Sequence, residues 1–240
     1  EQARVQPLPL EQRAKVTYDA YILGPGDGLQ IELLDDQRQL LATATPVEGG
    51  LRLDHTATAG ETFFLKLSGD QSAIDLRILN LVAASDGKVT ISGTDGVDVY
   101  SLLNGPYHRL VVHDIDYRFD TNQYSQFQID GGPAADTIWL GGTSGAETVD
   151  LRVGDTQVTG SGFSVQVDQV EDVTFVGRGG ADEATFYDTA GSDTFTSDPA
   201  WSKLLGNGYS HIVRAVPTVT AQTTTGYDQA FMRDSAGDDT

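Results

Sequence analysis

Residues 182–194, DEATFYDTAGSDT, return 46 positions later as residues 228–240, DQAFMRDSAGDDT. The same offset maps Gly160 and Phe163 onto Gly206 and Tyr209, so turns and apolar positions repeat together. Clear copies begin near residues 131, 177 and 223, the last one cut off, and a fainter copy begins near residue 85. Repeats of this length are typical of solenoids, in which each unit buries its apolar face against its neighbours. We therefore expect a solenoid that continues past the last residue.

From residue 18 onward, the chain consists of short β-branched and aromatic runs separated by Gly, Asp and Asn. Residues 30–33, 63–67, 74–78 and 164–167 are examples, and residues 110–117 alternate polar and apolar side chains in the same way. Only residues 10–15 resemble a helix, and they are too few to be stable alone. The sequence predicts an all-β fold.

A change of composition near residues 82–87 divides the chain into residues 15–82 and residues 83–240. Regularly spaced turn signals in the first part predict an antiparallel sandwich. Its segments 25–33, 40–42, 59–67 and 74–78 resemble the pre-peptidase C-terminal family, a jelly-roll-like accessory module of secreted bacterial proteins that has no catalytic residues. For the second part we expect a β-solenoid in which each repeat forms two coils of equal length. A sandwich with tandem repeats is the alternative.

An eight-residue pattern recurs in the second part, with Gly or Asp first, Gly or Ala fourth, Asp or Glu sixth and usually an apolar residue eighth. It resembles the nonapeptide of RTX, haemolysin-like solenoids, in which turn carbonyls and an Asp carboxylate bind Ca²⁺. The copies are Gly93–Tyr100, Gly131–Ile138, Gly142–Val149, Gly177–Ala184, Asp188–Phe195 and the truncated Asp234–Thr240. By position, the resemblance implies Asp98, Asp136, Glu147, Asp182, Asp193 and Asp239 as calcium ligands.

The pattern departs from that family in its spacing, because the step from Asp136 to Glu147 is much shorter than the step from Glu147 to Asp182. The alternative is that Gly and Asp only form turns, through left-handed backbone geometry and side-chain hydrogen bonds to the backbone. Sequence alone leaves both open.

Composition excludes several partners. The 240 residues include 35 acidic and 15 basic side chains, a net charge of −20, which disfavours nucleic acid and anionic membranes. There is no cysteine, hence no disulfide or thiolate metal site, and no apolar run is long enough to span a bilayer. The chain is predicted to be secreted or displayed on the cell surface.

No catalytic constellation stands out. His108 and His113, beside Asp114 and Asp116, fit a solvated strand better than a metal site, and His55 and His211 are isolated. Five aromatic residues could form a platform for sugar rings, although aromatic side chains in strands are more often core. They are Tyr100, Tyr107, Tyr117, Tyr124 and Trp139.

The resulting prediction is a non-catalytic structural or adhesive module of a large secreted or cell-surface bacterial protein. It would be stabilised by Ca²⁺ and assembled with neighbouring copies or repeats of itself, with fibre formation as a further expectation. The alternative is a carbohydrate-binding accessory module of a polysaccharide-processing enzyme, with an extracellular polysaccharide as its partner. The identity of a glycan or protein partner is not encoded in any motif.

Overall fold

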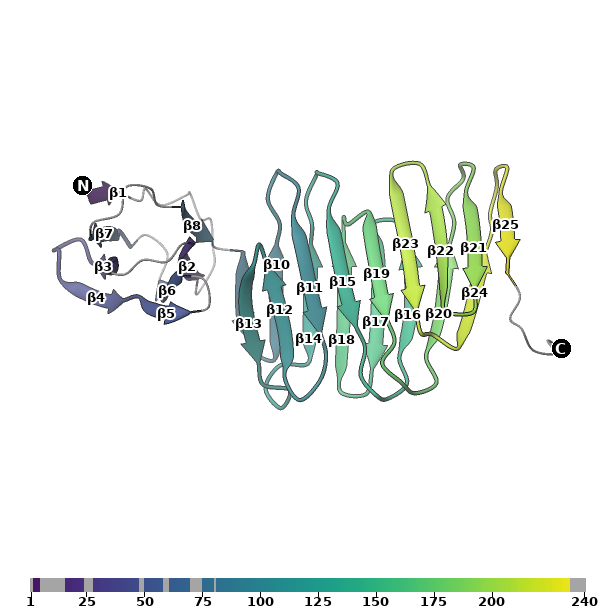
Figure 1. The fold of residues 1–240 in the computed structure, drawn as a ribbon, viewed down its shortest axis with the longest axis horizontal. Helices are drawn as coiled ribbons and strands as arrows, with labels where there is room; N and C mark the ends of the chain where they lie inside the picture. Colours follow the sequence, from purple (N-terminus) through teal and green to yellow (C-terminus); the bar gives the residue numbers. More distant parts are fainter. Residues whose placement is uncertain are drawn as a thin grey trace. The chain divides into compact units, whose positions relative to one another are not determined.

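The computed structural model describes residues 2–4, 16–23, 28–47, 50–57, 61–69, 75–79 and 81–233 (Figure 1). These residues form 25 strands and no helix, so none of them lies in a helix that could cross a membrane. The chain forms two compact units, Glu1–Ala83 and Ala84–Thr240. The short helix-like stretch at residues 10–15 lies outside the described residues.

Unit 1 consists of two four-stranded antiparallel sheets, ordered β1-β7-β3-β4 and β5-β6-β2-β8. Leu53 of one sheet packs with Ile31, Leu33 and Leu65 of the other in a buried cluster. The strands are β1 (Gln2–Arg4), β2 (Val16–Leu23), β3 (Gln30–Leu34), β4 (Leu40–Thr43), β5 (Thr45–Val47), β6 (Gly50–Ala57), β7 (Phe64–Ser68) and β8 (Asp75–Leu79).

Unit 2 is a β-solenoid made of two sheets, which confirms the predicted class. Sheet I has the order β24-β20-β16-β17-β18-β14-β10-β9, and sheet II the order β13-β12-β11-β15-β19-β23-β22-β21-β25. The strands are β9 (Val82–Ser85), β10 (Lys88–Ser92), β11 (Val99–Leu103), β12 (His108–Val112), β13 (Ile115–Phe119), β14 (Gln126–Asp130), β15 (Thr137–Gly141), β16 (Thr148–Arg152), β17 (Asp155–Gly160), β18 (Phe163–Asp168), β19 (Asp172–Val176), β20 (Glu183–Tyr187), β21 (Thr194–Asp198), β22 (Trp201–Gly206), β23 (Tyr209–Arg214), β24 (Thr218–Gln222) and β25 (Gln229–Met232).

The sequence repeat corresponds to five strands, and successive repeats exchange sheets. Strands β11 to β13 form an antiparallel meander in sheet II, followed by β14 in sheet I and β15 in sheet II. Strands β16 to β20 repeat this order with the meander in sheet I, and β21 to β25 return it to sheet II. One sequence repeat therefore moves each strand to the opposite sheet.

Two expectations about this unit were wrong. Lys88 pairs with Gln126 and Thr148 with Glu183, so parallel neighbours are offset by 38 or by 35 positions. Each repeat contains an antiparallel hairpin within one sheet, in addition to the strands that continue the coil. For this reason a repeat does not divide into two coils of equal length. Residues 110–117 are likewise not one strand. His113 and Asp114 both have positive φ, 49° and 68°, and form the tight turn between β12 and β13.

Alternation along each strand separates core from surface, as the period of two in a β-strand requires. Phe127 and Ile129 of β14 are buried between the sheets, whereas Gln126 and Gln128 point outward. The apolar core between the sheets runs from one coil to the next. Buried acidic residues lie beside it, in the loops that cross between the sheets.

Candidate metal centre

The recurring pattern forms the loops that carry the chain from one sheet to the other. Loops 93–98, 131–136, 188–193 and 223–228 lead from sheet I to sheet II and lie at one edge, called here the Asp98 edge. Loops 142–147 and 177–182 lead back and lie at the opposite edge, the Glu147 edge. In every loop the sixth residue is acidic and directly precedes a strand.

Strand register stacks these acidic residues in rows. Asp98, Asp136 and Glu171 are neighbours at the starts of β11, β15 and β19. Glu147 is a neighbour of Asp182, so the long step between them that looked irregular in the sequence is the offset between stacked strands. The predicted ligands are buried: Asp98 and Asp182 are 0% exposed, Asp136 1%, Glu147 and Asp193 2%. Asp239 lies outside the described residues.

The carboxylates of Asp136, Glu171, Asp182 and Asp228 each accept the backbone N–H of the acidic residue beside them. The N–H groups of Asp98 and Asp136 donate to Asp136 Oδ1 at 2.7 Å and to Glu171 Oε2 at 2.9 Å. Glu147 N–H donates to Asp182 Oδ1 at 2.9 Å. Asp193 N–H donates to Asp228 Oδ1 at 3.1 Å. These bonds satisfy loop amides that no ladder partner reaches, so the carboxylates tie each coil to the next.

The same carboxylates also close their own loops. Thr94 N–H donates to Asp98 Oδ2 at 2.6 Å, and Thr189 N–H donates to Asp193 Oδ2 at 2.9 Å. The hydroxyl of Thr143 donates to Glu147 Oε1. This is the side-chain-to-backbone bonding that Asp and Thr favour in turns.

In three loops the first residue is glycine because a side chain there would collide with the carboxylate. A left-handed backbone conformation is not the reason. A Cβ on Gly131 would lie 2.6 Å from Asp136 Oδ2, and one on Gly142 would lie 2.5 Å from Glu147 Oε2. Gly177 stands in the same relation to Asp182 Oδ2. The positive φ that the turn hypothesis expected at these three positions is absent.

In two of the repeats the meander adds a further contact to the first acidic loop. His113 bonds Asp98 Oδ1 through Nε2, and the Tyr209 hydroxyl donates to Asp193 Oδ1 at 2.9 Å. Tyr209 reaches Asp193 by passing over Gly206, where a side chain would collide with both residues. In the intervening repeat Phe163 lies over Gly160 in the same way, and lacks the hydroxyl that would bond an acid.

Burial without full hydrogen bonding changes the acidity of this region. Desolvation raises the pKa of Asp136, with repulsion from Asp98 and Glu171 acting in the same direction. Desolvation also raises the pKa of Glu147, and Asp182 adds to the rise. Asp136 Oδ2, Glu147 Oε2 and Asp182 Oδ2 accept no hydrogen bond from the described residues. Burial, followed by bonding to Asp193, raises the pKa of Tyr209, so its hydroxyl remains a donor.

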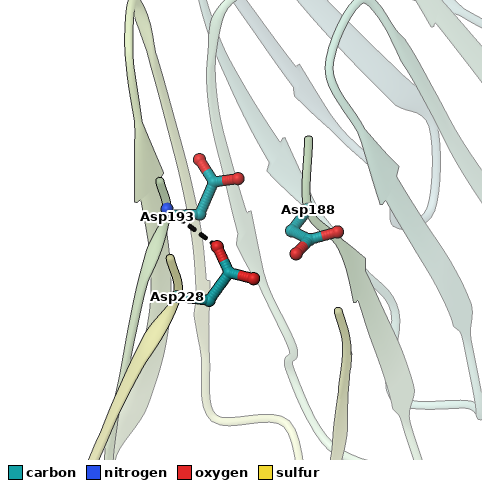
Figure 2. A group of neighbouring side chains, drawn as sticks. All are labelled: Asp188, Asp193 and Asp228. Carbon is teal, nitrogen blue, oxygen red and sulfur yellow. Dashed lines mark hydrogen bonds between the residues drawn. The ribbon is translucent and has the colours of Figure 1, made fainter. Parts of the chain in front are cut away.

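One group of carboxylates is suited to a hard cation. Asp188, Asp193 and Asp228 each offer an oxygen within 4.8 Å of the others. Figure 2 shows Asp193 and Asp228 one above the other, directly before the adjacent strands β21 and β25, with Asp188 beside them at the start of loop 188–193. The buried Asp188 Oδ1 accepts no hydrogen bond from the described residues. Three carboxylates are an oxygen set of the kind that Ca²⁺ binds.

The sequence identified Asp193 of this group and missed its two partners. Asp228 ends loop 223–228, which begins with Thr in place of Gly or Asp, and Asp188 was read as the first residue of a turn. The offset of 35 positions would have found Asp228, because Glu147 and Asp182 have the same separation. Glu171 was missed because the turn that carries it is short and lacks the pattern.

The other candidate residues are mostly core. His108 is 3% exposed, bonds Asn104 Oδ1 at 2.7 Å and packs on Phe127. His211 is 0% exposed, and its ring nitrogens have no partner among the described residues. The proposed aromatic platform does not form, because Tyr100 and Tyr117 are buried. Trp139 remains 50% exposed on β15, and Tyr107 39% in the β11–β12 loop.

Comparison with protein-family models, curated protein sequences and solved structures returned no match. The two family resemblances of the sequence therefore remain predictions.

Proposed function

We propose that this chain is a non-catalytic structural or adhesive module of a large secreted or cell-surface bacterial protein, and that its partners are neighbouring copies or repeats of itself. The observation that carries the proposal is the use of the acidic side chains at the loop ends. The carboxylates of Asp136, Glu171, Asp182 and Asp228, groups that would be expected to do chemistry, instead accept backbone N–H groups of the adjacent coil, those of Asp98, Asp136, Glu147 and Asp193.

The architecture supports the same role. Parallel ladders run through both sheets, and each repeat buries its apolar side chains against the repeats beside it. Such an arrangement holds its ends a fixed distance apart, which suits a spacer or stalk. The acidic composition keeps such a surface solvated.

We further propose that Ca²⁺ binds at Asp188, Asp193 and Asp228. A cation there would neutralise three carboxylates that otherwise repel each other across two adjacent coils. Its contribution would be to tie β21 to β25, the last parallel pair of sheet II.

Single-molecule force spectroscopy tests the structural role. The chain is held between handles at its two ends, and unit 1 serves as an internal reference. We expect the solenoid to resist at least the force that unfolds unit 1, and to lengthen in multiples of one sequence repeat, about 160 Å each. A solenoid that extends before unit 1, without such steps, would contradict a structural role.

A carbohydrate-binding function is the second candidate, supported by Trp139. Its indole is half exposed on the outer face of sheet II, between Ser101 of β11 and Thr174 of β19 in register. A flat aromatic face beside hydroxyl groups suits a pyranose ring. Retention on an extracellular polysaccharide that Trp139→Ala abolishes, and Tyr187→Ala on the other sheet leaves unchanged, would favour this function.

A further inference from the structure

The two outer faces of the solenoid differ in chemistry. On sheet II the outward-facing side chains include Val99, Leu103, Val111, Trp139, Leu205 and Ile212. Three of them, Val99, Trp139 and Leu205, are 56%, 50% and 46% exposed. On strands β10, β14, β16, β17, β18 and β20 of sheet I, the outward-facing positions contain no Val, Leu, Ile, Met or Phe. Apolar side chains gathered on one face indicate a surface for a partner.

The sequence repeat shows that the fold does not require these apolar side chains. Because successive repeats exchange sheets, residues that are 46 positions apart occupy equivalent places on opposite faces. Gln166 and Thr159 of sheet I correspond in this way to Ile212 and Leu205 of sheet II. A repeat that served only to build the coil would carry similar side chains at both places. The apolar residues therefore follow the face of the molecule and have a role outside the coil.

The apolar side chains of sheet II lie close together across its strands. Register places Val111, Trp139 and Ile212 in one row on β12, β15 and β23. In the next row Leu103 lies over Gly141, where an added Cβ would be 2.7 Å from the Leu103 Cδ2 atom. The space left by the glycine is filled, and a flat surface of this kind suits the outer face of another sheet.

The area of this face is sufficient for a specific complex. The eight strands from β13 to β21 lie about 4.8 Å apart, and each has about five residues of about 3.3 Å, so the face covers about 600 Å². Two such faces in contact would bury about 1,200 Å², which lies at the lower end of the range for specific protein–protein interfaces. Most of the apolar side chains are aliphatic and offer no hydrogen bond to a sugar, so they favour a protein as the occupant.

The charges of this face permit that protein to be a second copy of the chain. The outward-facing positions from β13 to β21 carry four basic and three acidic side chains, whereas those of the six sheet I strands carry two basic and five acidic ones. On sheet II these residues are Arg109, Arg118, Lys203 and Arg214, and Asp116, Asp172 and Asp198. In a protein with a net charge of −20, two copies meet here with little of the repulsion that acidic surfaces cause.

We propose that two copies of the chain pack face to face through the outer surfaces of sheet II, about a two-fold axis that runs parallel to the strands between β15 and β19. The inference rests on the proposed structural role, and names the surface through which that module meets its partner. Trp139 then lies opposite Thr174 of the second copy. Each copy uses its one apolar face, so the assembly closes as a dimer and leaves the polar face of sheet I in water.

Charge selects this axis over one that runs along the solenoid. Asp116 and Lys203 both lie in the middle row of the face, so an axis along the solenoid would set each against its own equivalent in the second copy. The axis parallel to the strands instead brings Arg118 to Asp198. Arg109 and Arg118 share Asp116, at 2.9 Å and 3.7 Å, which leaves that end of the face with a surplus positive charge for Asp198.

Sedimentation velocity and tryptophan fluorescence of the whole chain test the contact, because Trp139 and Trp201 both lie on this face. We expect a monomer–dimer equilibrium, with a blue shift of the emission over the same range of protein concentration. Trp139→Thr combined with Ile212→Gln introduces the residues that occupy the equivalent positions of sheet I, so the variant should fold and should dimerise about tenfold more weakly or less. Tyr187→Thr, which removes the outward-facing aromatic ring of β20, should leave the equilibrium unchanged.

Cross-linking tests the direction of packing separately, because the natural chain has no cysteine. The probe is a short bis-maleimide added to Val111→Cys, to Lys203→Cys and to their equimolar mixture; both positions lie in the middle row. The proposed axis sets these two positions opposite each other, so the covalent dimer should come chiefly from the mixture. The control Gln128→Cys, in the middle of the outer face of sheet I, should give a markedly smaller yield.

Three results would overturn the proposal. They are a monomer at every concentration, a dimer that the double variant leaves unchanged, and covalent dimers from each cysteine variant alone in the yield of the mixture. A monomer whose retention on a polysaccharide is lost in the double variant would assign the face to a glycan instead. A monomer that still resists force would leave the structural role intact, and a dimer that yields before unit 1 would remove that role alone.

Discussion

Replacing Tyr209 by Phe tests whether the meander contacts stabilise the acidic loops. The Tyr209 hydroxyl donates to Asp193 Oδ1 at 2.9 Å, and the two residues are only 3% and 2% exposed. Phe occupies nearly the same volume, so the substitution removes one hydrogen bond and leaves the ring over Gly206 in place. Phe163 shows that the fold accepts a phenyl ring at the equivalent position of the preceding repeat.

The expected loss follows from the burial of the acceptor. A hydrogen bond to a charged group contributes about 1.5–3 kcal/mol, and the abandoned carboxylate oxygen cannot recover a water at this depth. We therefore expect the free energy of unfolding to fall by about 2 kcal/mol. For a unit of this size that corresponds to a decrease in Tm of about 4–8 °C.

Urea unfolding followed by tryptophan fluorescence measures this change in the solenoid alone, because Trp139 and Trp201 both lie in unit 2. The midpoint should decrease with an unchanged slope. The matched control is Tyr187→Phe, whose hydroxyl is 3.4 Å from Asp150 Oδ1 on the outer face and should matter by less than about 0.5 kcal/mol. Equal effects of the two substitutions would refute the reasoning.

Three further predictions concern the same unit. Glu147 and Phe163 occupy the positions of Asp193 and Tyr209 in the preceding repeat, so Glu147→Asp combined with Phe163→Tyr should recreate that hydrogen-bonded pair. A double-mutant cycle measured by urea unfolding should then give a favourable coupling of about 1 kcal/mol, and additive effects would contradict it. Burial lowers the pKa of His211 to about 4 from 6.5. The unfolded chain therefore binds more protons between these values, and stability present above pH 6.5 should fall by about 3 kcal/mol as the pH decreases toward 4. His211→Leu should remove this dependence, and an unchanged difference between pH 7 and pH 4 would exclude it. Millimolar Ca²⁺ should raise the Tm measured in EDTA by several degrees, and Asp188→Asn should abolish the rise while Asp150→Asn preserves it; no rise in the natural chain would argue against the ion.

The sequence predicted the all-β class and the solenoid because both depend on local signals. Alternation within a strand and a long sequence repeat are readable without knowing which strands pair. The exchange of sheets between repeats was not predictable. Because each repeat contains a hairpin, the 46-residue period of the sequence differs from the 35 or 38 positions that separate parallel neighbours in a sheet. The turn at His113 and Asp114 was missed because positive φ is uncommon for residues other than glycine.

At the candidate site, the pattern selected acidic residues that the structure buries, and it could not reveal their partners. Asp98 and Asp136 stack only because β11 and β15 pair in parallel, a long-range fact absent from any local motif. The glycine at position 131 is explained by the space that the Gln169 carbonyl and Asp136 Oδ2 occupy, which no turn preference indicates. Burial of Tyr100 and exposure of Trp139 followed from the sheet face each occupies.

The most direct test of the account is amide hydrogen exchange at four loop residues, Asp98, Asp136, Glu147 and Asp193, measured by NMR in EDTA. Their N–H groups lie outside the strand ladders and donate to carboxylates of the adjacent coil. We predict that they exchange as slowly as amides within β15 and β19, without any added metal ion. Exchange as fast as that of the exposed loop residue Asp95, slowed only when Ca²⁺ is added, would contradict a structural role for the carboxylate rows.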